Sequence, residues 1–518
     1  MSKFLKGTMI LMIAALITRI LGFINRIVVA RLIGEEGVGL YMMAFPTLVL
    51  VITLTQLGLP VAISKSVAEA EAQGNRKKVK NILAVSLAVT TGLSLIFTPA
   101  LILLAPFLSE VLFTDDRTYY PLVAIAPVIP IIAISSVIRG YFQGKQNMKP
   151  AAISQVIEQV VRIALIAVMT KAFLPYGIQY AAAGAMVASV FGELVSLLYM
   201  FTMFKMKKKF PVRRNFFKAL SKGKETLSEL MAVAIPTTGS RLIGSLSWFF
   251  EPIVVSNSLA IAGVTAIVAT KQYGALTGYA LPLLFLPSFV TVSLSTSLVP
   301  AISEAYALKQ LRTVEYRLQE ALRFSLVTGG LAVVLLFIFA FPLMEMMYGS
   351  SKAAPFIKLM APFFLFYYYQ GPLQAVLQAL NLARAAMINS LIGAVVKIGL
   401  IFILASQPSF GIYGAAMGIV VGFMVVTLLH FATMLKVIPM SFYVKDYLKF
   451  ATVTTLTGFF GMWWYEHALL NSALILRLLT GLSLVSALYV TLLSLLGVIT
   501  KKDFMRIPFV KSLFHIKK

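Results

Sequence analysis

Four basic residues lie deep inside long apolar runs, where a charge needs a partner. At about 1.5 Å per helical residue, Arg19 and Arg241 lie about 17–18 Å from the inner ends of their runs, and Arg162 and Lys397 lie at a similar depth in two others. A cation at mid-helix costs about 2.5–3.5 kcal/mol in a membrane. We therefore expect these side chains to face a watery cavity, a counter-ion or an anionic substrate.

Other polar residues in the apolar runs could support such a site. Glu158 precedes Arg162 by four residues, so the two share a helix face and can pair, which would either neutralise the arginine or position it. Arg26 lies near the outer membrane interface, where it either binds substrate or extends to the headgroups. Glu251 lies near the outer end of its run. Gln374 belongs to a polar stripe that either lines a cavity or bonds neighbouring helices.

The composition indicates that membrane helices position these residues. The chain of 518 residues is 59% hydrophobic and 12% charged, whereas soluble domains are about 25% charged. We expect an all-α polytopic membrane protein with 14 transmembrane helices. The apolar runs that predict them are 8–33, 39–64, 82–105, 121–138, 151–174, 180–204, 229–257, 273–299, 321–347, 355–379, 386–405, 412–435, 447–466 and 473–499.

The basic residues also predict the orientation of the chain. If the N-terminus is inside, the inner segments hold 33 lysines and arginines and the outer segments hold six. Cytoplasmic loops carry such an excess of positive charge. We therefore expect a multi-pass protein of the cell membrane with both termini in the cytoplasm. The net charge of +26 then indicates contact with anionic membrane lipids, not with nucleic acid.

The sequence contains an internal repeat. Runs 1–6 correspond to runs 7–12, and because six is even the two halves have the same orientation. Two such bundles can enclose a cavity that opens to either side, which is the architecture of a transporter. The expected organisation is an N-lobe at 1–204, a basic cytoplasmic linker at 205–228, a C-lobe at 229–436, and two further spans with a basic cytoplasmic tail at 437–518. The matching blocks are 18–22 with 240–244, 160–163 with 395–398, and 176–182 with 410–416.

Several kinds of chemistry are excluded or disfavoured. The chain has no cysteine, so it forms no disulfide and has no thiolate nucleophile. The three histidines are scattered, with no carboxylate at metal-ligand spacing, and we expect neither a metal site nor a catalytic residue. No phosphate-binding loop of the G-x-x-x-x-G-K-[ST] type occurs. We expect a protein that is not an enzyme, uses no cofactor and does not hydrolyse ATP.

Two stretches resemble a known family. They are TRILGFINRIVVARLIG at 18–34 and RGYFQGKQNMKPAAISQVIEQVVR at 139–162. The first resembles the first helix of the multidrug/oligosaccharidyl-lipid/polysaccharide exporter superfamily, especially its lipid II flippases. The second is similar to the polysaccharide-exporter branch, and length, spans and both stretches together resemble sporulation proteins of that branch.

The resemblance implies a 14-helix, two-lobed flippase for undecaprenyl-pyrophosphate-linked sugars, with lipid II for spore cortex peptidoglycan as the expected substrate. Arg19 matches an arginine of the family that is proposed to meet the pyrophosphate. The family's next arginine falls at Asn25, one place before Arg26, and its basic pair in the second span is replaced by Leu50 and Val51. The substrate-binding residues expected are Arg19, Arg26, Arg162, Arg241 and Lys397, supported by Glu158, Glu251 and Gln374.

Two other functions compete with the flippase. A cation-coupled multidrug antiporter of the same fold would need an acidic cavity. This sequence instead has four mid-depth cations and about three buried carboxylates. A non-transporting membrane scaffold could recruit cell-wall synthesis or sporulation proteins through basic inner loops. That function would give Arg19 and Arg241 no reason to lie at mid-depth.

Overall fold

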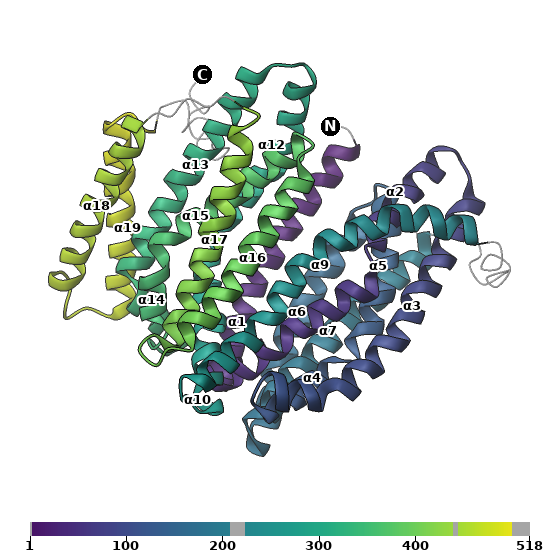
Figure 1. Ribbon diagram of the computed structural model, residues 1–518, viewed down its shortest axis with the longest axis horizontal. Helices are drawn as coiled ribbons and strands as arrows, with labels where there is room; N and C mark the ends of the chain where they lie inside the picture. Colours follow the sequence, from purple (N-terminus) through teal and green to yellow (C-terminus); the bar gives the residue numbers. More distant parts are fainter. Residues whose placement is uncertain (1–2, 208–222, 439–443, 500–518) are drawn as a thin grey trace. The chain divides into compact units, whose positions relative to one another are not determined.

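The computed structural model describes residues 3–207, 223–438 and 444–499, and its regular structure in these ranges is helical (Figure 1). The α-helices are α1 (Lys3–Gln56), α2 (Leu59–Ala72), α3 (Arg76–Phe107), α4 (Tyr119–Ile125), α5 (Val128–Gly144), α6 (Lys149–Phe173), α7 (Ile178–Lys207), α9 (Lys224–Ile261), α10 (Ala266–Gly274), α11 (Leu281–Phe285), α12 (Ser288–Ala307), α13 (Leu311–Ile338), α14 (Ala340–Tyr348), α15 (Ala354–Ala379), α16 (Ala383–Ala405), α17 (Gly411–Leu435), α18 (Val444–His467) and α19 (Leu474–Leu495). Short π- and 3-10 segments are η1 (Leu108–Leu112), η2 (Asp116–Thr118), η3 (Leu174–Tyr176) and η4 (Ala275–Ala280).

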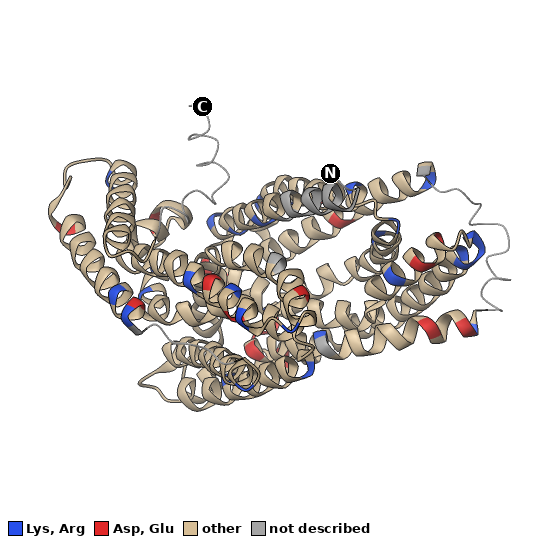
Figure 2. Cartoon of the chain, turned by 90° about the horizontal axis from the view of Figure 1, so that it is seen from above, with Lys and Arg blue, Asp and Glu red and all other residues tan. Residues whose placement is uncertain are grey.

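The predicted all-α membrane architecture is confirmed. Each apolar run of the sequence falls mainly within one or more of these helices. In the ranges that the structure describes, nine helices are long and apolar enough to cross a membrane, or ten if the pair Ala266–Phe285 and Ser288–Ala307 counts as one broken span. Charged residues are sparse along the helices, most of which are tan in Figure 2. The count of 14 spans stays a prediction.

Glycines break the helices of the first two predicted spans at two places. α1 covers the first span and most of the second, with a break between them at Gly34, where φ is 65°. The second span is divided at Gly58, where φ is 62° and α2 begins. Gly58 is required there for two reasons: its backbone is left-handed, and a Cβ would lie 2.5 Å from the carbonyl oxygen of Ala234.

Three later spans are also interrupted, and one of these ends beyond its predicted limit. The run 121–138 is divided at Ala126 and Pro127, the run 273–299 at Leu286 and Pro287, and the run 321–347 at Phe339. The run 121–138 ends within α5, which continues to Gly144. Residue 139 therefore lies in a helix and not in the loop that the apolar pattern predicted, because the pattern records where apolar residues stop and not where the helix ends.

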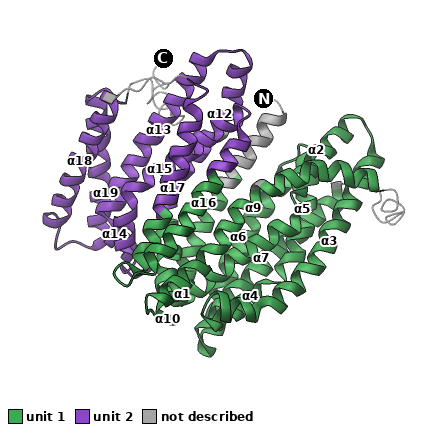
Figure 3. Ribbon diagram, in the orientation of Figure 1, with its two compact units in different colours: residues 1–282, 390–419 green, residues 283–389, 420–518 purple. Residues whose placement is uncertain are grey.

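The chain divides into two compact units (Figure 3). Unit 1 comprises Met1–Pro282 and Ser390–Ile419, and unit 2 comprises Leu283–Asn389 and Val420–Lys518. The lobes inferred from the repeat stay a prediction. Most of the predicted linker at 205–228, and the predicted tail after residue 499, lie outside the described residues.

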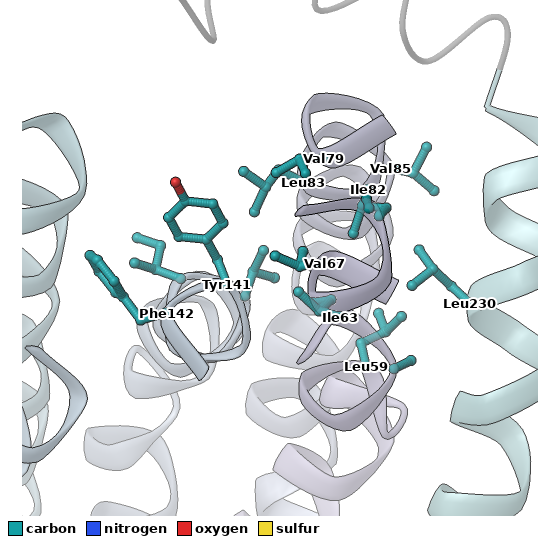
Figure 4. Close-up of a cluster of buried hydrophobic side chains, with 14 of the residues drawn as sticks. Leu59, Ile63, Val67, Val79, Ile82, Leu83, Val85, Tyr141, Phe142 and Leu230 are labelled. Carbon is teal, nitrogen blue, oxygen red and sulfur yellow. The ribbon is translucent and has the colours of Figure 1, made fainter. Parts of the chain in front are cut away.

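Unit 1 has a hydrophobic cluster at the start of α9 (Figure 4). Leu230 of α9 is fully buried and shares this cluster with side chains of α2, α3 and α5, among them Ile63, Ile82 and Tyr141. Two ion pairs lie beside this cluster: Lys78 Nζ is 2.9 Å from Glu229 Oε2, and Lys145 Nζ is 3.1 Å from Glu71 Oε1. The first turns of α9 are thus fixed to helices of the N-terminal half.

The helices of unit 2 are held together by tyrosine hydrogen bonds and by a glycine at a close helix contact. The buried Tyr368 of α15 donates a 2.8 Å hydrogen bond to the carbonyl oxygen of Leu284. Tyr489 of α19 donates one of 3.0 Å to the carbonyl oxygen of Val327 on α13. A Cβ at Gly330 would lie 2.4 Å from the Phe450 ring of α18, so this glycine lets α13 approach α18 closely. The two C-terminal helices therefore pack directly on α13.

Candidate functional site

Arg19 and Arg241 are exposed cations well inside long helices. Arg19 lies about halfway between the start of α1 and the break at Gly34, and Arg241 lies near the middle of α9. Both side chains are exposed. Neither forms an ion pair or hydrogen bond with any residue in the described part of the chain. Because a membrane cation without a counter-ion is costly, these two arginines need water or an anion.

Arg26 lies on the same side of α1 as Arg19, facing α6. A Cβ at Gly22 would lie 3.9 Å from Gln159 Oε1 of α6, which identifies the side of α1 that faces α6. Arg19 and Arg26 are three residues before and four residues after Gly22, so they share that side. Arg26 is partly buried, and the neighbouring Asn25 is buried.

Arg162 is neutralised within its own helix, as its spacing predicted. It forms an ion pair with Glu158, and the two side chains are 18% and 12% exposed. Gly192 of α7 packs against this turn, because a Cβ there would lie 3.0 Å from the Glu158 carbonyl oxygen and 3.2 Å from Arg162 Cβ. The pair therefore lies at the contact between α6 and α7.

Lys397 of α16 is neutralised by a distant residue. Its Nζ atom is 2.7 Å from Oε2 of Glu251 on α9, and the two side chains are 13% and 7% exposed. The sequence identified both residues but not their pairing, because 146 positions separate them. The five predicted substrate-binding cations all belong to unit 1. Of the five, Arg162 and Lys397 already have carboxylate partners.

Gln374 belongs to unit 2 and is exposed. One turn earlier on α15, Gln370 donates a 2.8 Å hydrogen bond from Nε2 to the carbonyl oxygen of Phe423 on α17. At Gln370, the polar stripe therefore bonds a neighbouring helix, which is one of its two predicted roles.

The ion pair between Arg139 and Glu193 was not predicted from the sequence. Arg139 Nη2 of α5 is 3.7 Å from Glu193 Oε1 of α7, and the Glu193 side chain is 6% exposed. Glu193 also lies beside Glu158 of α6 and Ser135 of α5. The sequence signal was an intramembrane carboxylate at position 193, but its partner was assigned to a loop because the apolar run ended at residue 138.

A network of charged groups joins α1, the 113–118 segment and α10 within unit 1. Arg117 pairs with Glu36 of α1 and lies 2.9 Å from Asp115 Oδ2. Thr270 of α10 donates a 2.6 Å hydrogen bond to the same Asp115 oxygen. Burial of Asp115 would raise its pKa, but the hydrogen bonds from Arg117 and Thr270 and the charge of Arg117 outweigh burial, so the pKa is lowered.

Glycines allow α1 and α10 to approach closely beside this network. A Cβ at Gly39 would lie 2.0 Å from the Thr270 carbonyl oxygen, and one at Gly274 would lie 2.1 Å from the Glu35 carbonyl oxygen. Helices in membranes often pack through such small residues. Here, the contact joins the second predicted span to the eighth, so unit 1 contains elements from both halves of the repeat.

Comparison with known proteins identifies the family. Residues 4–306 match the model of the polysaccharide biosynthesis protein family. The chain is also 60% identical over 510 residues to stage V sporulation protein B of Bacillus subtilis (strain 168), covering 98% of both chains. The chain belongs to the polysaccharide biosynthesis protein family. This confirms the resemblance in the sequence, and residues 248–403 also match the MatE model.

One curated relative and one solved structure similar to this polysaccharide biosynthesis family member are flippases by name. The chain is 26% identical over 420 residues to lipid II flippase MurJ of Bacillus subtilis (strain 168), covering 77% of this chain and 76% of that one. Among solved structures, "Lipid II flippase MurJ, inward closed conformation" matches with a TM-score of 0.70 and 18% identity, covering 93% of this chain and 98% of that one. The structural likeness shows that the fold is shared. The long apolar helices of the described residues support a multi-pass membrane protein.

Proposed function

We propose that this protein is a flippase that moves a polyprenyl-pyrophosphate-linked glycan across the cytoplasmic membrane by alternating access, with lipid II for spore cortex peptidoglycan as the substrate. The relationship to stage V sporulation protein B supports the sporulation context. The relationship to a lipid II flippase supports the class of substrate. Both termini lie in the cytoplasm, and translocation makes and breaks no covalent bond.

The observation that carries the proposal is the distribution of charge among the mid-depth cations. Glu158 and Glu251 neutralise Arg162 and Lys397. Arg19 and Arg241 have no carboxylate partner among the residues described, although each lies in the middle of a helix. An anionic headgroup would supply the missing charge. A pyrophosphate fits this role, because arginine binds its oxygens through two parallel hydrogen bonds.

The remaining predicted residues have secondary roles. Arg26 adds positive charge on the side of α1 that carries Arg19. Arg162 and Lys397 are held in place by their carboxylate partners and offer hydrogen-bond donors to the substrate. Gln374 offers an uncharged polar group to the glycan. Anionic membrane lipids contact the basic inner segments, and cell-wall synthesis proteins are further candidate partners there.

The test is translocation of labelled lipid II by purified protein in liposomes without nucleotide. We expect the wild type to flip the lipid and both Arg19→Ala and Arg241→Ala to reduce the rate at least tenfold while inserting normally. Arg19→Lys should keep part of the activity, because the charge remains but the planar guanidinium is lost. Arg76→Ala is the matched control, because Arg76 is an exposed cation at the first residue of α3.

Three outcomes would refute the proposal or the role of the two arginines. Near wild-type flipping by both alanine variants would show that these arginines do not bind the headgroup. Export of cationic dyes without any flipping would instead identify a multidrug antiporter. A protein that moves neither kind of substrate would be a scaffold, and its basic inner segments would then be the place to search for partners.

A further inference from the structure

Two buried carboxyl groups lie side by side where α5, α6 and α7 meet in unit 1. The Glu193 side chain is 6% exposed and that of Glu158 is 12% exposed, and the two carboxyl groups are direct neighbours. The backbones of α6 and α7 are held in contact at this level by Gly192. Two carboxylates in such contact cannot both ionise without a large cost, so one of them tends to hold a proton.

Charge pairing in this cluster is uneven. Glu158 has a direct partner in Arg162. The contact from Arg139 to Glu193 is 3.7 Å, well beyond the roughly 2.7–2.9 Å of a charge-assisted hydrogen bond. A buried carboxylate is costly unless it is both paired and hydrogen-bonded. Of the two carboxyl groups, Glu193 is therefore the one for which the neutral, protonated form is favoured.

A buried hydroxyl group also lies beside Glu193. Ser135 lies against the Glu193 carboxyl group and is 1% exposed. Its hydroxyl can donate to an ionised Glu193 as well as accept from a protonated one, so it does not decide between the two forms. Ionised carboxylates can only accept, so a hydrogen bond between Glu158 and Glu193 requires a proton on one of them.

We infer that Glu158 and Glu193 form a proton-binding site in which the two carboxyl groups share one exchangeable proton. On release, an O–H bond of Glu193 breaks and the proton passes to water. Two carboxylates then face two guanidinium groups, and the charge of the cluster changes from +1 to zero. A metal cation is excluded from the pair by Arg139 and Arg162, which would repel it.

The charges on α1 link this site to the headgroup site, and this step rests on the proposed function. Arg19 and Arg26 share the side of α1 that faces α6, and their positive potential opposes protonation of Glu193. An anionic headgroup bound to these arginines reduces that potential and favours proton uptake. By linkage, protonation strengthens headgroup binding by the same factor. Proton movement is thereby coupled to the transport cycle.

The proton itself can be detected without any transport assay. Infrared spectroscopy of the purified full-length protein at neutral pH should show the C=O band of a protonated carboxylic acid. Glu193→Gln and Glu158→Gln should both lose this band, because an amide then replaces one partner and donates to the other. Glu466→Gln, which changes an exposed carboxylate at the end of α18, should keep it. Normal elution from a sizing column identifies the variants that are folded.

Three results would overturn the proton site. The first is the absence of the band in the wild type, and the second is its persistence in folded Glu193→Gln. A band that appears only when sodium is removed would show that the carboxyl groups bind that cation instead.

Coupling is tested separately, with labelled lipid II in liposomes that carry a pH gradient. We expect the wild-type rate to change severalfold with the gradient and the Glu193→Gln rate to be independent of it. Equal dependence in both would refute coupling through Glu193. If the wild type flips no lipid II at all, the proposed function fails, whereas the infrared result still decides whether the proton site exists.

Discussion

Breaking the Lys397–Glu251 pair should destabilise the protein strongly. At 2.7 Å and an effective dielectric constant of about 20, the attraction between the two charges is about 6 kcal/mol. When both partners are present, the cost of removing the two charges from water offsets much of this attraction. When one partner is removed, the remaining buried charge keeps its desolvation cost and loses the attraction. Removing one partner of a buried pair typically costs about 3–5 kcal/mol. We expect a loss of that size in the free energy of unfolding for Lys397→Met, which strands Glu251.

A double variant separates the ion pair from other effects of the substitution. Lys397→Met combined with Glu251→Met removes both charges and keeps similar volumes, and such replacements are often neutral or stabilising. The double variant should therefore be more stable than Lys397→Met alone. Lys78→Met is the matched control: its 2.9 Å pair with Glu229 is similar in length, but the side chains are 32% and 41% exposed. It should lose at most about 1 kcal/mol.

The assay is equilibrium unfolding in detergent, supported by melting temperatures from size-exclusion of heated samples. The order expected for stability is wild type and double variant, then Lys78→Met, then Lys397→Met. If Lys397→Met is as stable as the wild type, the reasoning from burial is wrong. If the double variant is stable but does not flip lipid II, Lys397 has a binding role in addition to its structural one.

Two further predictions concern the contact between α1 and α10. The pKa of Asp115 is lower in the folded protein, so its ionised form stabilises the fold above its unfolded pKa of about 3.9, and this stability is lost as pH falls through the folded pKa. Melting temperature against pH should therefore fall more steeply in acid for the wild type than for Asp115→Asn, and equal slopes would contradict the assignment. Gly274→Ala places a Cβ 2.1 Å from the Glu35 carbonyl oxygen and should cost about 1–3 kcal/mol. Gly92→Ala, which meets nothing within 4 Å, should change stability by less than about 1 kcal/mol, in the stabilising direction; equal effects of the two would refute the packing argument.

The helices could be predicted from the sequence because a membrane helix is a local feature. An apolar run of about 20 residues must satisfy its backbone hydrogen bonds internally, whatever surrounds it. The packing faces of glycines follow from local spacing for the same reason. Gly414 and Gly418 are four residues apart and so share one face of α17, and a Cβ at either position would lie within 3 Å of α16.

The breaks in the helices could not be predicted in the same way, because their causes are tertiary. Gly58 divides the second span where the backbone of α9 approaches at Ala234, a residue that lies 176 positions later in the chain. The partner of Glu193 was missed for a related reason. Arg139 follows an apolar run, and it lies in a helix beside Glu193 only because α5 continues to Gly144.

The two repeat-related cations show how far local reasoning can identify a binding site. Arg162 and Lys397 occupy matching positions, but the residue that matches Glu158 in the second half is Gly393. The second cation therefore cannot be neutralised within its own helix, and Glu251 of α9 takes that role. Spacing within one helix finds the first pair and cannot find the second. Depth in the membrane shows that each cation needs an anion, but only the packed helices distinguish Arg162 and Lys397, whose anions are part of the protein, from Arg19 and Arg241, for which the substrate would supply the anion.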